Sequence, residues 1–384
     1  MSKLLRQYQD LETLVSPGQV LVIYGPRQVG KTTLLNSYLG KTKWKYRFDQ
    51  GDNTDIQDRL SSLSFSQILP IVEGLDLYVI DEAQKIPHIG DALKILVDQR
   101  PDLRLITTGS SSFELADQIG EPLTGRKHTI TLYPLSQLEL SQENNRFTLK
   151  ENLADYLLYG SYPRVLTTQS RTGKIDTLTE LVDSYLFKDI LSLERIKGAK
   201  PLRQILQLLA HQIGSTVSYN ELATQVSLDV KTVARYLDLL EKTFVIYSLP
   251  GYAKNLRGEV TAQKKYYFYD LGIRNAVIQQ FNDLNLRSDV GALWENFLML
   301  ERLKFRSYTG RYANPYFWRT HSQKEVDLIE EYDGVLHAIE FKWGKNDAKP
   351  PKAFLNSYPT ASFTCINQDN YQDFILSSSA HPAH

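Results

Sequence analysis

The sequence predicts an α/β protein built on a parallel sheet and continued by smaller helical and α/β modules. Over the first 135 residues, short apolar runs alternate with helical patterns, as parallel strands joined by crossover helices do. The expected strands are Gln19–Tyr24, Lys45–Phe48, Leu77–Ile80, Arg104–Thr108 and His128–Leu132. Residues from about 136 to 215 are mostly helical in pattern, and a helix–turn–helix pattern and a helix with a β-hairpin follow. Three or four modules are therefore expected.

Composition excludes several classes of protein. The chain has 384 residues, of which 42% are apolar and 23% charged, an ordinary globular balance. No apolar run reaches the length of a membrane span, and the first residues do not resemble a signal peptide. The only cysteine, Cys365, rules out an intrachain disulfide and a cysteine-based zinc site. A cytoplasmic protein without a membrane partner is expected.

Charge is balanced over the whole chain, with 44 basic and 44 acidic residues. Any nucleic-acid binding must therefore come from a local patch. Residues 197–266 contain ten basic and five acidic residues, which makes this segment the candidate.

A phosphate-binding loop follows the first expected strand. Residues 25–32 match the pattern GxxxxGK[ST], with an apolar strand before them and a helix after them. Backbone N–H groups of such a loop surround phosphates at a helix N-terminus. Lys31 is expected to reach the β- and γ-phosphates of ATP, and Thr32 to hold Mg²⁺. The expected nucleotide-binding residues are Gly25, Pro26, Arg27, Gln28, Val29, Gly30, Lys31, Thr32, Thr33 and Asp81.

A second acidic element supports ATP hydrolysis. The apolar run 75–80 ends in Asp81 and Glu82, at the strand end where ligands of open α/β sheets bind. Asp81 is expected to support the magnesium shell, and Glu82 to orient and polarise the attacking water. The alternative is a solvated strand end, which the complete loop about 50 residues earlier disfavours.

Two further residues are candidates for the same reaction. Ser110 follows the expected strand 104–108 and would lie between Asp81 and the γ-phosphate; its alternative role is a helix N-cap. Arg126 would stabilise transition-state charge from its own or a neighbouring subunit, so a homo-oligomer is one expectation; the alternative is a surface arginine.

Together the segments GPRQVGKTTLL, YVIDEAQKIP, TTGSSSFEL, LTGR and YPLSQLEL resemble the AAA-type ATPase domain of a large family of prokaryotic AAA+/STAND-like P-loop ATPases. In that family the ATPase domain is joined to a C-terminal domain of unknown function. The resemblance extends to YLLYGSYPRVL and EVDLI…AIEFKW, and so covers nearly the whole chain. It implies the sensor position for Ser110 and the arginine position for Arg126.

The segment 216–270 has the outline of a winged helix-turn-helix. Ser218 and Glu221 form a capping-box pattern before a short helix, and a second helix near Asp229–Lys242 has apolar residues at helical spacing. Two strand-like runs, 244–249 and 266–269, follow. For double-stranded DNA the expected contacts are Lys231, Thr232 and Arg235 on the helix, and Lys254, Arg257, Lys264 and Lys265 on the wing. The alternative is a winged helix used for protein contacts or for packing.

A hairpin near the C-terminus suggests a second metal site. Glu325–Tyr332 and Val335–Trp343 are joined by Asp333-Gly334, a preferred two-residue turn. The register places Asp327 opposite Glu340, where a divalent cation would relieve their repulsion, with Lys342 on the same face. Such a site could hydrolyse phosphodiesters, and its spacing resembles the PD-(D/E)xK nuclease fold. Glu295, on an upstream amphipathic helix, matches the acidic residue that completes such sites; Val326 replaces the proline of the motif.

We therefore expect an AAA-type P-loop ATPase domain (1–135), a helical lid or linker (136–215), a winged helix-turn-helix (216–270), a PD-(D/E)xK nuclease-like α/β domain (271–376) and a tail (377–384). The expected function is magnesium-dependent ATP hydrolysis that controls DNA binding and metal-dependent DNA cleavage. One alternative is a nucleotide-controlled signalling or defence switch whose C-terminal modules contact proteins and cut nothing. Another is a DNA-binding regulator with slow ATP turnover, and an inactive remnant is the alternative for the hairpin site.

Overall fold

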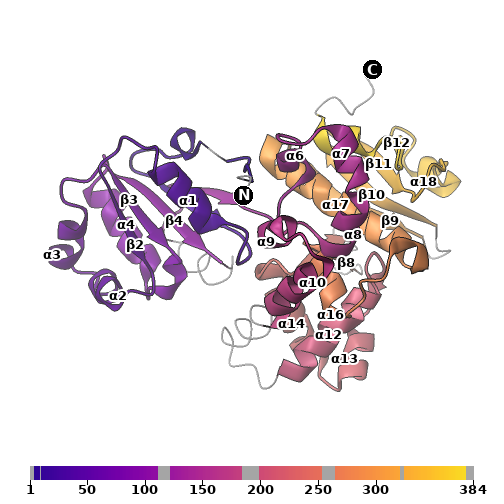
Figure 1. Ribbon diagram of the computed structural model, residues 1–384, viewed down its shortest axis with the longest axis horizontal. Helices are drawn as coiled ribbons and strands as arrows, with labels where there is room; N and C mark the ends of the chain where they lie inside the picture. Colours follow the sequence, from indigo (N-terminus) through magenta and orange to yellow (C-terminus); the bar gives the residue numbers. More distant parts are fainter. Residues whose placement is uncertain are drawn as a thin grey trace. The chain divides into compact units, whose positions relative to one another are not determined.

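The computed structural model describes residues 4–8, 10–110, 122–183, 199–252, 264–320 and 324–377 (Figure 1). The chain divides into two compact units. The first, here the N-terminal unit, is Arg6–Tyr133 with Lys242–Phe244; the second, the C-terminal unit, is Met1–Leu5, Pro134–Glu241 and Val245–His384. Residues 136–215, expected as a lid or linker, thus group with the C-terminal unit, and their role as a lid stays a prediction.

A five-stranded parallel sheet forms the centre of the N-terminal unit. Its strands are β1 (Val20–Tyr24), β2 (Tyr46–Gln50), β3 (Leu77–Asp81), β4 (Arg104–Gly109) and β5 (Lys127–Thr131), in the order β2-β3-β4-β1-β5. All four neighbouring pairs are parallel. The predicted parallel sheet is confirmed, with strand ends shifted by one or two residues. Because β4 lies between β1 and β3, its end faces the space between the phosphate loop and the acidic strand.

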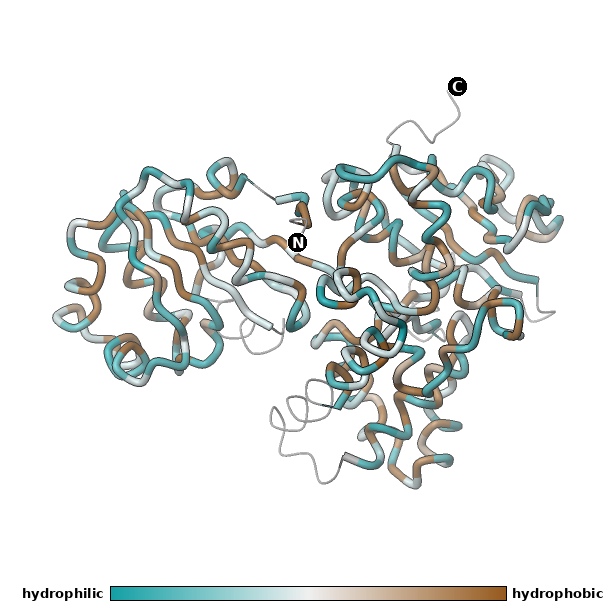
Figure 2. Tube along the Cα trace, viewed as in Figure 1, coloured by the Kyte–Doolittle hydropathy of each residue, from teal (hydrophilic) through white to brown (hydrophobic). Residues whose placement is uncertain are grey.

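Helices cover this sheet because its central strands are buried on both faces, whereas the outer strands β2 and β5 are more polar and partly exposed. β1 and β3 are buried along their whole length, and brown, hydrophobic stretches run through the centre of this unit in Figure 2. On one face, Val20, Val22 and Tyr24 share a core with residues of three helices. These are α2 (Thr54–Ser61), α3 (Phe65–Ile68) and α4 (Ile89–Gln99); α1 (Lys31–Leu39) follows β1, and the short 3-10 turns are η1 (Leu11–Thr13), η2 (Leu69–Val72) and η3 (Ala83–Lys85).

The C-terminal unit begins with helices. They are α6 (Gln137–Leu140), α7 (Arg146–Glu151), α8 (Leu153–Tyr159), α9 (Pro163–Thr167), α10 (Arg171–Glu180) and α12 (Ala199–His211). The break expected at 160–163 is present, since Gly160 ends α8 with φ 70° and Pro163 opens α9. Gly160 must be glycine because a Cβ there would lie 2.0 Å from Oδ1 of Asp270.

A small sheet follows with two helices. The strands β6 (Thr216–Val217), β7 (Ile246–Pro250) and β8 (Lys264–Phe268) pair antiparallel in the order β6-β8-β7. The helices α13 (Tyr219–Val226) and α14 (Val230–Lys242) lie where the sequence predicts them. Ser218 Oγ accepts the backbone N–H of Glu221 at 3.4 Å. The assignment as a winged helix stays a prediction, and the wing residues Lys254 and Arg257 lie outside the described residues.

The last part of the unit is a four-stranded sheet with order β12-β11-β10-β9. Its elements are α16 (Leu271–Val277), η5 (Leu284–Leu286), α17 (Val290–Thr309), β9 (Asn314–Arg319), β10 (Glu325–Tyr332), β11 (Val335–Phe341), α18 (Lys352–Ser357), β12 (Ser362–Ile366) and α19 (Tyr371–Leu376). The predicted hairpin register is confirmed from Tyr332↔Val335 to Leu328↔Ile339. Asp333 and Gly334 both have positive φ, as a two-residue type I′ turn requires. In the described part of the chain, no helix is long and apolar enough to cross a bilayer.

Candidate functional site

The phosphate loop is shaped by two glycines at its ends. Gly25 has φ 149°, and a Cβ at this position would lie 2.1 Å from the carbonyl oxygen of Leu132, so the loop passes too close to the backbone after β5 for any side chain. Gly30 has φ 97° and precedes the first residue of α1. Both positions lie in a region of backbone conformation that favours glycine. The loop therefore turns tightly from the end of β1 into the N-terminus of α1, where backbone N–H groups attract anions.

Lys31 lies inside this loop. Its ammonium donates to the carbonyl oxygens of Gly25 at 2.7 Å and Pro26 at 2.9 Å, and the residue is 5% exposed. Burial lowers the pKa of Lys31 to about 8, although the nearby charges of Glu82 and Asp81 act in the opposite direction. The ammonium donates these two hydrogen bonds to neutral carbonyl oxygens, so a phosphate group would provide it with a directly bonded anionic partner.

Thr32 and Asp81 meet across the end of the sheet. The hydroxyl of Thr32 donates to Oδ2 of Asp81 at 2.6 Å, although the residues are 49 positions apart. A hydroxyl and a carboxylate at this place are oxygen donors of the kind that Mg²⁺ prefers. The residues present therefore fit Mg²⁺ beside a bound nucleotide.

Thr108 completes this arrangement and was missed by the sequence analysis. Its hydroxyl donates to Oδ1 of Asp81 and accepts the backbone N–H of Glu82 at 3.0 Å. One hydroxyl from the end of β4 thus fixes both acidic residues at the end of β3. The insertion of β4 between β1 and β3 brings it there. The sequence predicts a polar side chain from this strand end beside Asp81, but the sequence analysis selected Ser110 rather than Thr108.

The side-chain carboxylate of Glu82 also accepts a hydrogen bond. Gln84 donates its amide to Oε2 of Glu82 at 2.7 Å and to the hydroxyl of Ser110 at 3.0 Å. Gln84 is 8% exposed, as is Ser110. Glu82 itself has a left-handed backbone, with φ 53° and ψ 44°, an uncommon conformation for a residue other than glycine. The structure therefore brings Ser110 next to Glu82, through a glutamine that the sequence analysis did not select.

Arg126 lies at the end of the same sheet where its parallel strands begin, opposite the end that carries the phosphate loop. It immediately precedes β5, and its carbonyl accepts the N–H of Val20, the first residue of β1. Its guanidinium pairs with Asp98 in an exposed ion pair. Since a strand rises about 3.3 Å per residue, the five residues of β1 separate Arg126 from the phosphate loop. Action on a nucleotide in its own subunit does not fit this placement.

The predicted C-terminal metal ligands are near one another but do not form a metal site. Burial, followed by the charges of Glu295 and Glu340, raises the pKa of Asp327 well above its usual range. Asp327 accepts the N–H of Phe341 at 2.8 Å, and Glu340 pairs with Lys342 at 2.7 Å. Among the described residues, no group of three or more histidine, cysteine, aspartate or glutamate side chains could hold a metal ion. The residues present thus do not fit the second divalent metal expected from the sequence.

The predicted DNA-contacting residues differ in exposure: some are exposed, and others are buried or engaged within the chain. Lys231 and Arg235 are exposed on α14. The Thr232 hydroxyl is instead engaged within the chain, since it donates at 2.6 Å to Asp229, which also accepts the backbone N–H of Thr232 at 2.8 Å and so caps the helix start. Lys265 was expected on a DNA phosphate, and this prediction is wrong: its side chain is 0% exposed and pairs with Glu295 and Glu325. The neighbouring Lys264, whose side chain is 40% exposed, lies near Glu241.

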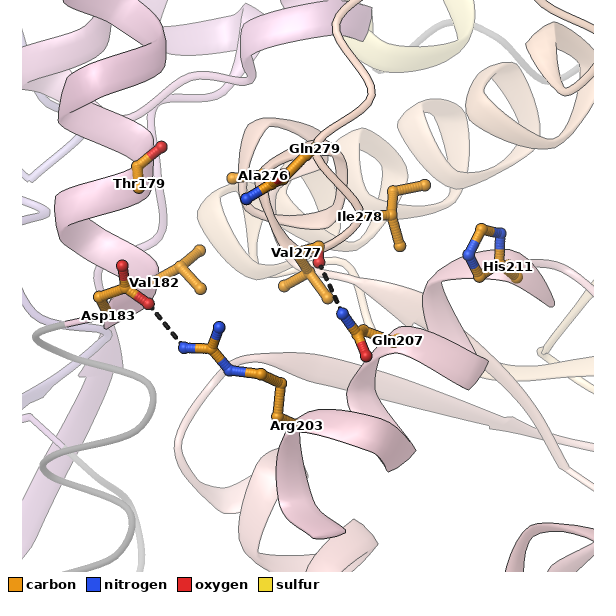
Figure 3. Close-up of a pocket in the computed structure, with 10 residues that line it drawn as sticks. All are labelled: Thr179, Val182, Asp183, Arg203, Gln207, His211, Ala276, Val277, Ile278 and Gln279. Carbon is orange, nitrogen blue, oxygen red and sulfur yellow. Dashed lines mark hydrogen bonds and ion pairs between the residues drawn. The ribbon is translucent and has the colours of Figure 1, made fainter. Parts of the chain in front are cut away.

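A cavity of about 270 Å³ lies elsewhere, in the C-terminal unit (Figure 3). It is lined by residues of α10, α12 and α16 and the segments that follow α10 and α16, including Arg203, Gln207 and His211. Arg203 pairs with Asp183 at 2.7 Å, and Gln207 contacts the carbonyl of Val277 at 3.5 Å. These groups satisfy one another, and none of the predicted site residues lines the cavity.

Comparisons with protein families divide the chain into three matches. Residues 17–141 match an AAA domain. Residues 150–284 match a domain of unknown function, DUF8612, and residues 290–375 match another, DUF4143. The AAA match contains the phosphate loop, the acidic strand and the end of β4.

Several proteins are similar over most of this chain. Uncharacterized proteins of Mycobacterium tuberculosis and Mycobacterium bovis are each 30% identical over 333 residues, which are 84% of this chain and 70% of the relative. An uncharacterized protein of Haemophilus influenzae is 26% identical over 341 residues, 83% of this chain and 81% of the relative. A solved signal-transduction ATPase with a tetratricopeptide repeat sensor from Pyrococcus horikoshii is 14% identical, covering 79% of this chain and 47% of that one, with a TM-score of 0.28. That score is too low to indicate a shared arrangement.

Proposed function

We propose that this chain, which belongs to the family of the two mycobacterial relatives and carries an AAA domain, hydrolyses ATP at the phosphate loop and uses the nucleotide state to control binding of duplex DNA by its C-terminal unit. The AAA domain makes it a nucleotide-binding ATPase. The observation that carries the proposed chemistry is the 2.6 Å contact between Thr32 and Asp81, since it joins the loop to the acidic strand.

Each residue has a proposed part in hydrolysis. Lys31 binds the β- and γ-phosphates after giving up its two carbonyl acceptors, and Thr32 and Asp81 hold Mg²⁺. Bound with ATP, this ion neutralises phosphate charge. Glu82 orients the attacking water and accepts its proton, while Thr108 keeps Asp81 and Glu82 in place. Ser110 lies next to Glu82 and is proposed to contact the γ-phosphate.

Arg126 is proposed to act on a nucleotide of a neighbouring subunit. Arg126 lies at the end of the sheet away from the phosphate loop, and its pair with Asp98 is exposed; both observations support this assignment. Hydrolysis at full rate then requires a homo-oligomer. Turnover per subunit should rise with protein concentration, and mixing an Arg126→Ala variant with a Glu82→Gln variant should restore part of the activity that each lacks alone. An absence of both effects would remove Arg126 from the site.

The ATPase assignment is tested with two variants and matched controls. Lys31→Ala should abolish nucleotide binding, and Glu82→Gln should bind ATP but lose turnover by at least about a hundredfold. The controls are Lys41→Ala and Glu73→Gln, which change exposed residues of the same types in the same unit. Phosphate release and binding of a fluorescent ATP analogue are measured. Full turnover in both Lys31→Ala and Glu82→Gln would overturn the assignment.

DNA binding is proposed for the exposed start of α14. Lys231 and Arg235 are exposed there, and the chain around them has a local basic excess. Exposed cations on a helix bind phosphates with an affinity that falls as salt rises. Metal-dependent cleavage is left out of the proposal because the described acidic residues do not fit a metal. The second candidate is a nucleotide-controlled switch in which the C-terminal unit contacts a protein partner, and the same α14 surface would then serve it.

A gel-shift or anisotropy titration with a duplex separates these two candidates. Lys231→Ala combined with Arg235→Ala should weaken duplex binding about tenfold and flatten its salt dependence. Lys94→Ala, an exposed lysine of the other unit, is the control. If wild-type protein binds no duplex at low salt with or without ATP, the protein-contact switch is favoured.

A further inference from the structure

A buried lysine in the C-terminal unit pairs with two carboxylates of a group of four. The carboxylates, here called the acidic cluster, belong to Glu295 of α17, Glu325 and Asp327 of β10, and Glu340 of β11. Lys265 of β8 reaches into this cluster from another sheet, and its side chain is 0% exposed. The two family matches that cover these residues, 150–284 and 290–375, assign no role to Lys265 or to the acidic cluster.

The contacts of Lys265 are those of a bound cation. Its ammonium pairs with Oε1 of Glu325 and lies 3.1 Å from Oε1 of Glu295. The hydroxyl of Tyr267 donates to the same oxygen of Glu295 at 2.7 Å. Burial by itself would lower the pKa of Lys265, but the charges of Glu295, Asp327 and Glu325 outweigh it and raise the pKa, so the lysine stays charged.

The other carboxylates are also engaged by groups of the protein. Oδ2 of Asp327 accepts the backbone N–H of Phe341, and Oε1 of Glu340 accepts from Lys342. Oε2 of Glu325 lies 3.4 Å from Arg319. The cluster therefore takes its positive charge, and most of its hydrogen-bond donors, from within the chain. The exception is Oε2 of Glu340, which is buried and has no hydrogen-bond partner in the part of the chain that the structure describes.

Lys265 cannot easily leave this place. It lies in β8, the central strand of its sheet, where it is paired with Thr216 on one side and Leu249 on the other. A metal entering the cluster would have to displace an ammonium whose backbone is fixed on both sides. A buried charge without a partner costs several kcal/mol, so exchange of lysine for metal is unfavourable.

We infer that Lys265 is the resident cation of the acidic cluster, and that the cluster is a metal-free ionic joint connecting β8, α17 and β10. The inference does not depend on the proposed ATPase or DNA-binding function. It gives the C-terminal unit a fold that needs no divalent ion. It also identifies one residue whose removal would open the cluster to metal, because four carboxylates would then face two remaining cations, Lys342 and Arg319.

The test compares Mn²⁺ binding to nucleotide-free, full-length protein with and without Asp327→Asn, by paramagnetic resonance and thermal melting. Wild type and Asp327→Asn should bind the same amount of Mn²⁺, and neither chelator nor Mn²⁺ should move the wild-type Tm through this site. Any weak binding near Thr32 and Asp81 cancels in the comparison. Mn²⁺ binding to wild type that Asp327→Asn removes would overturn the inference.

The complementary variant is Lys265→Met, which keeps the length of the side chain and removes its charge. It should melt several degrees lower than wild type without metal, regain part of that loss with millimolar Mn²⁺, and lose this response when combined with Asp327→Asn. A far-ultraviolet circular dichroism spectrum like that of wild type serves as the check that the protein is folded. If Lys265→Met folds and its Tm does not change with Mn²⁺, then Lys265 is not what excludes the metal. If this variant does not fold, the wild-type comparison still decides.

Discussion

The side-chain amide of Gln84 donates a hydrogen bond to the carboxylate of Glu82 at 2.7 Å. The same amide nitrogen contacts the hydroxyl of Ser110 at 3.0 Å. The residue proposed to orient water is thus held in one position by a buried neighbour, two residues along the chain. Because the Gln84 amide contacts Glu82 and Ser110, its proposed part is to position Glu82.

Replacing Gln84 should therefore lower the rate of hydrolysis more than it weakens ATP binding. Gln84→Ala should reduce kcat about tenfold and change KM little, because positioning of a general base is expressed in the chemical step. Gln84→Glu should lose more, since it places two carboxylates together. Steady-state phosphate release checks both, and a Gln84→Ala enzyme with wild-type kcat would show that Glu82 needs no such support.

Thr108 offers a comparison between two adjacent threonines. Thr108→Val removes a hydroxyl bonded to Asp81 and to the N–H of Glu82, and it should raise the Mg²⁺ concentration needed for half-maximal turnover by about tenfold to a hundredfold. The control is Thr107→Val. Thr107 is equally buried, but its hydroxyl has no hydrogen-bond partner in the part of the chain that the structure describes. Equal effects of the two changes would argue against the part proposed for Thr108.

The lowered pKa of Lys31 predicts a pH dependence of ATP binding. In the free protein this pKa is about 8, and anionic phosphates would raise it, so ATP binding takes up a proton when the pH exceeds about 8. Affinity should consequently fall as pH rises above 8, by up to about tenfold per unit. Lys31→Arg remains charged throughout this range and should bind more weakly, with a flat profile. Binding of an ATP analogue measured from pH 7 to 9.5 distinguishes the two; a flat wild-type profile contradicts the prediction.

Gly51 lies beside the acidic strand, and its replacement tests how closely that strand is packed. Its N–H donates to the carbonyl of Asp81 at 2.7 Å, and a Cβ on Gly51 would lie 2.2 Å from the carbonyl oxygen of Glu82. Gly51→Ala should displace Glu82 and reduce turnover about tenfold or more. Gly40→Ala is the control, because a Cβ there meets its nearest atom at an ordinary 3.4 Å. Circular dichroism confirms that both variants fold.

Local patterns predicted much of the fold. Alternating apolar runs located all five strands of the parallel sheet, and the Asp333-Gly334 turn fixed the register of β10 and β11, because a two-residue loop leaves one pairing between its flanking residues. Residues that chemistry requires at fixed spacing, such as Lys31 and Thr32, were likewise found without a structure. In each case the information lies within a few consecutive residues.

The errors and omissions arose where residues distant in sequence come together. Lys264 and Lys265 were both expected on DNA, but successive residues of a strand point to opposite faces. Only one of those faces is covered by α17 and β10, and the sequence does not indicate which. Thr108 and Gln84 lie in the segments TTGSSSFEL and YVIDEAQKIP, but the sequence does not indicate which polar residues of these segments contact the acidic strand. They became candidates because β4 and the turn after β3 place them against Asp81 and Glu82.

The sequence by itself determined that this protein has a phosphate loop, an acidic strand and a parallel sheet to connect them, since each depends on short-range spacing and backbone geometry. The tertiary structure alone decided the rest of the chemistry. Strand order brought Thr108 to Asp81 and set Arg126 at the end of the sheet away from the phosphate loop, and the packing of β8 against α17 turned an expected metal site into an ion cluster around Lys265. Burial and charge pairing depend on which distant surfaces meet, and that is settled only when the whole chain has folded.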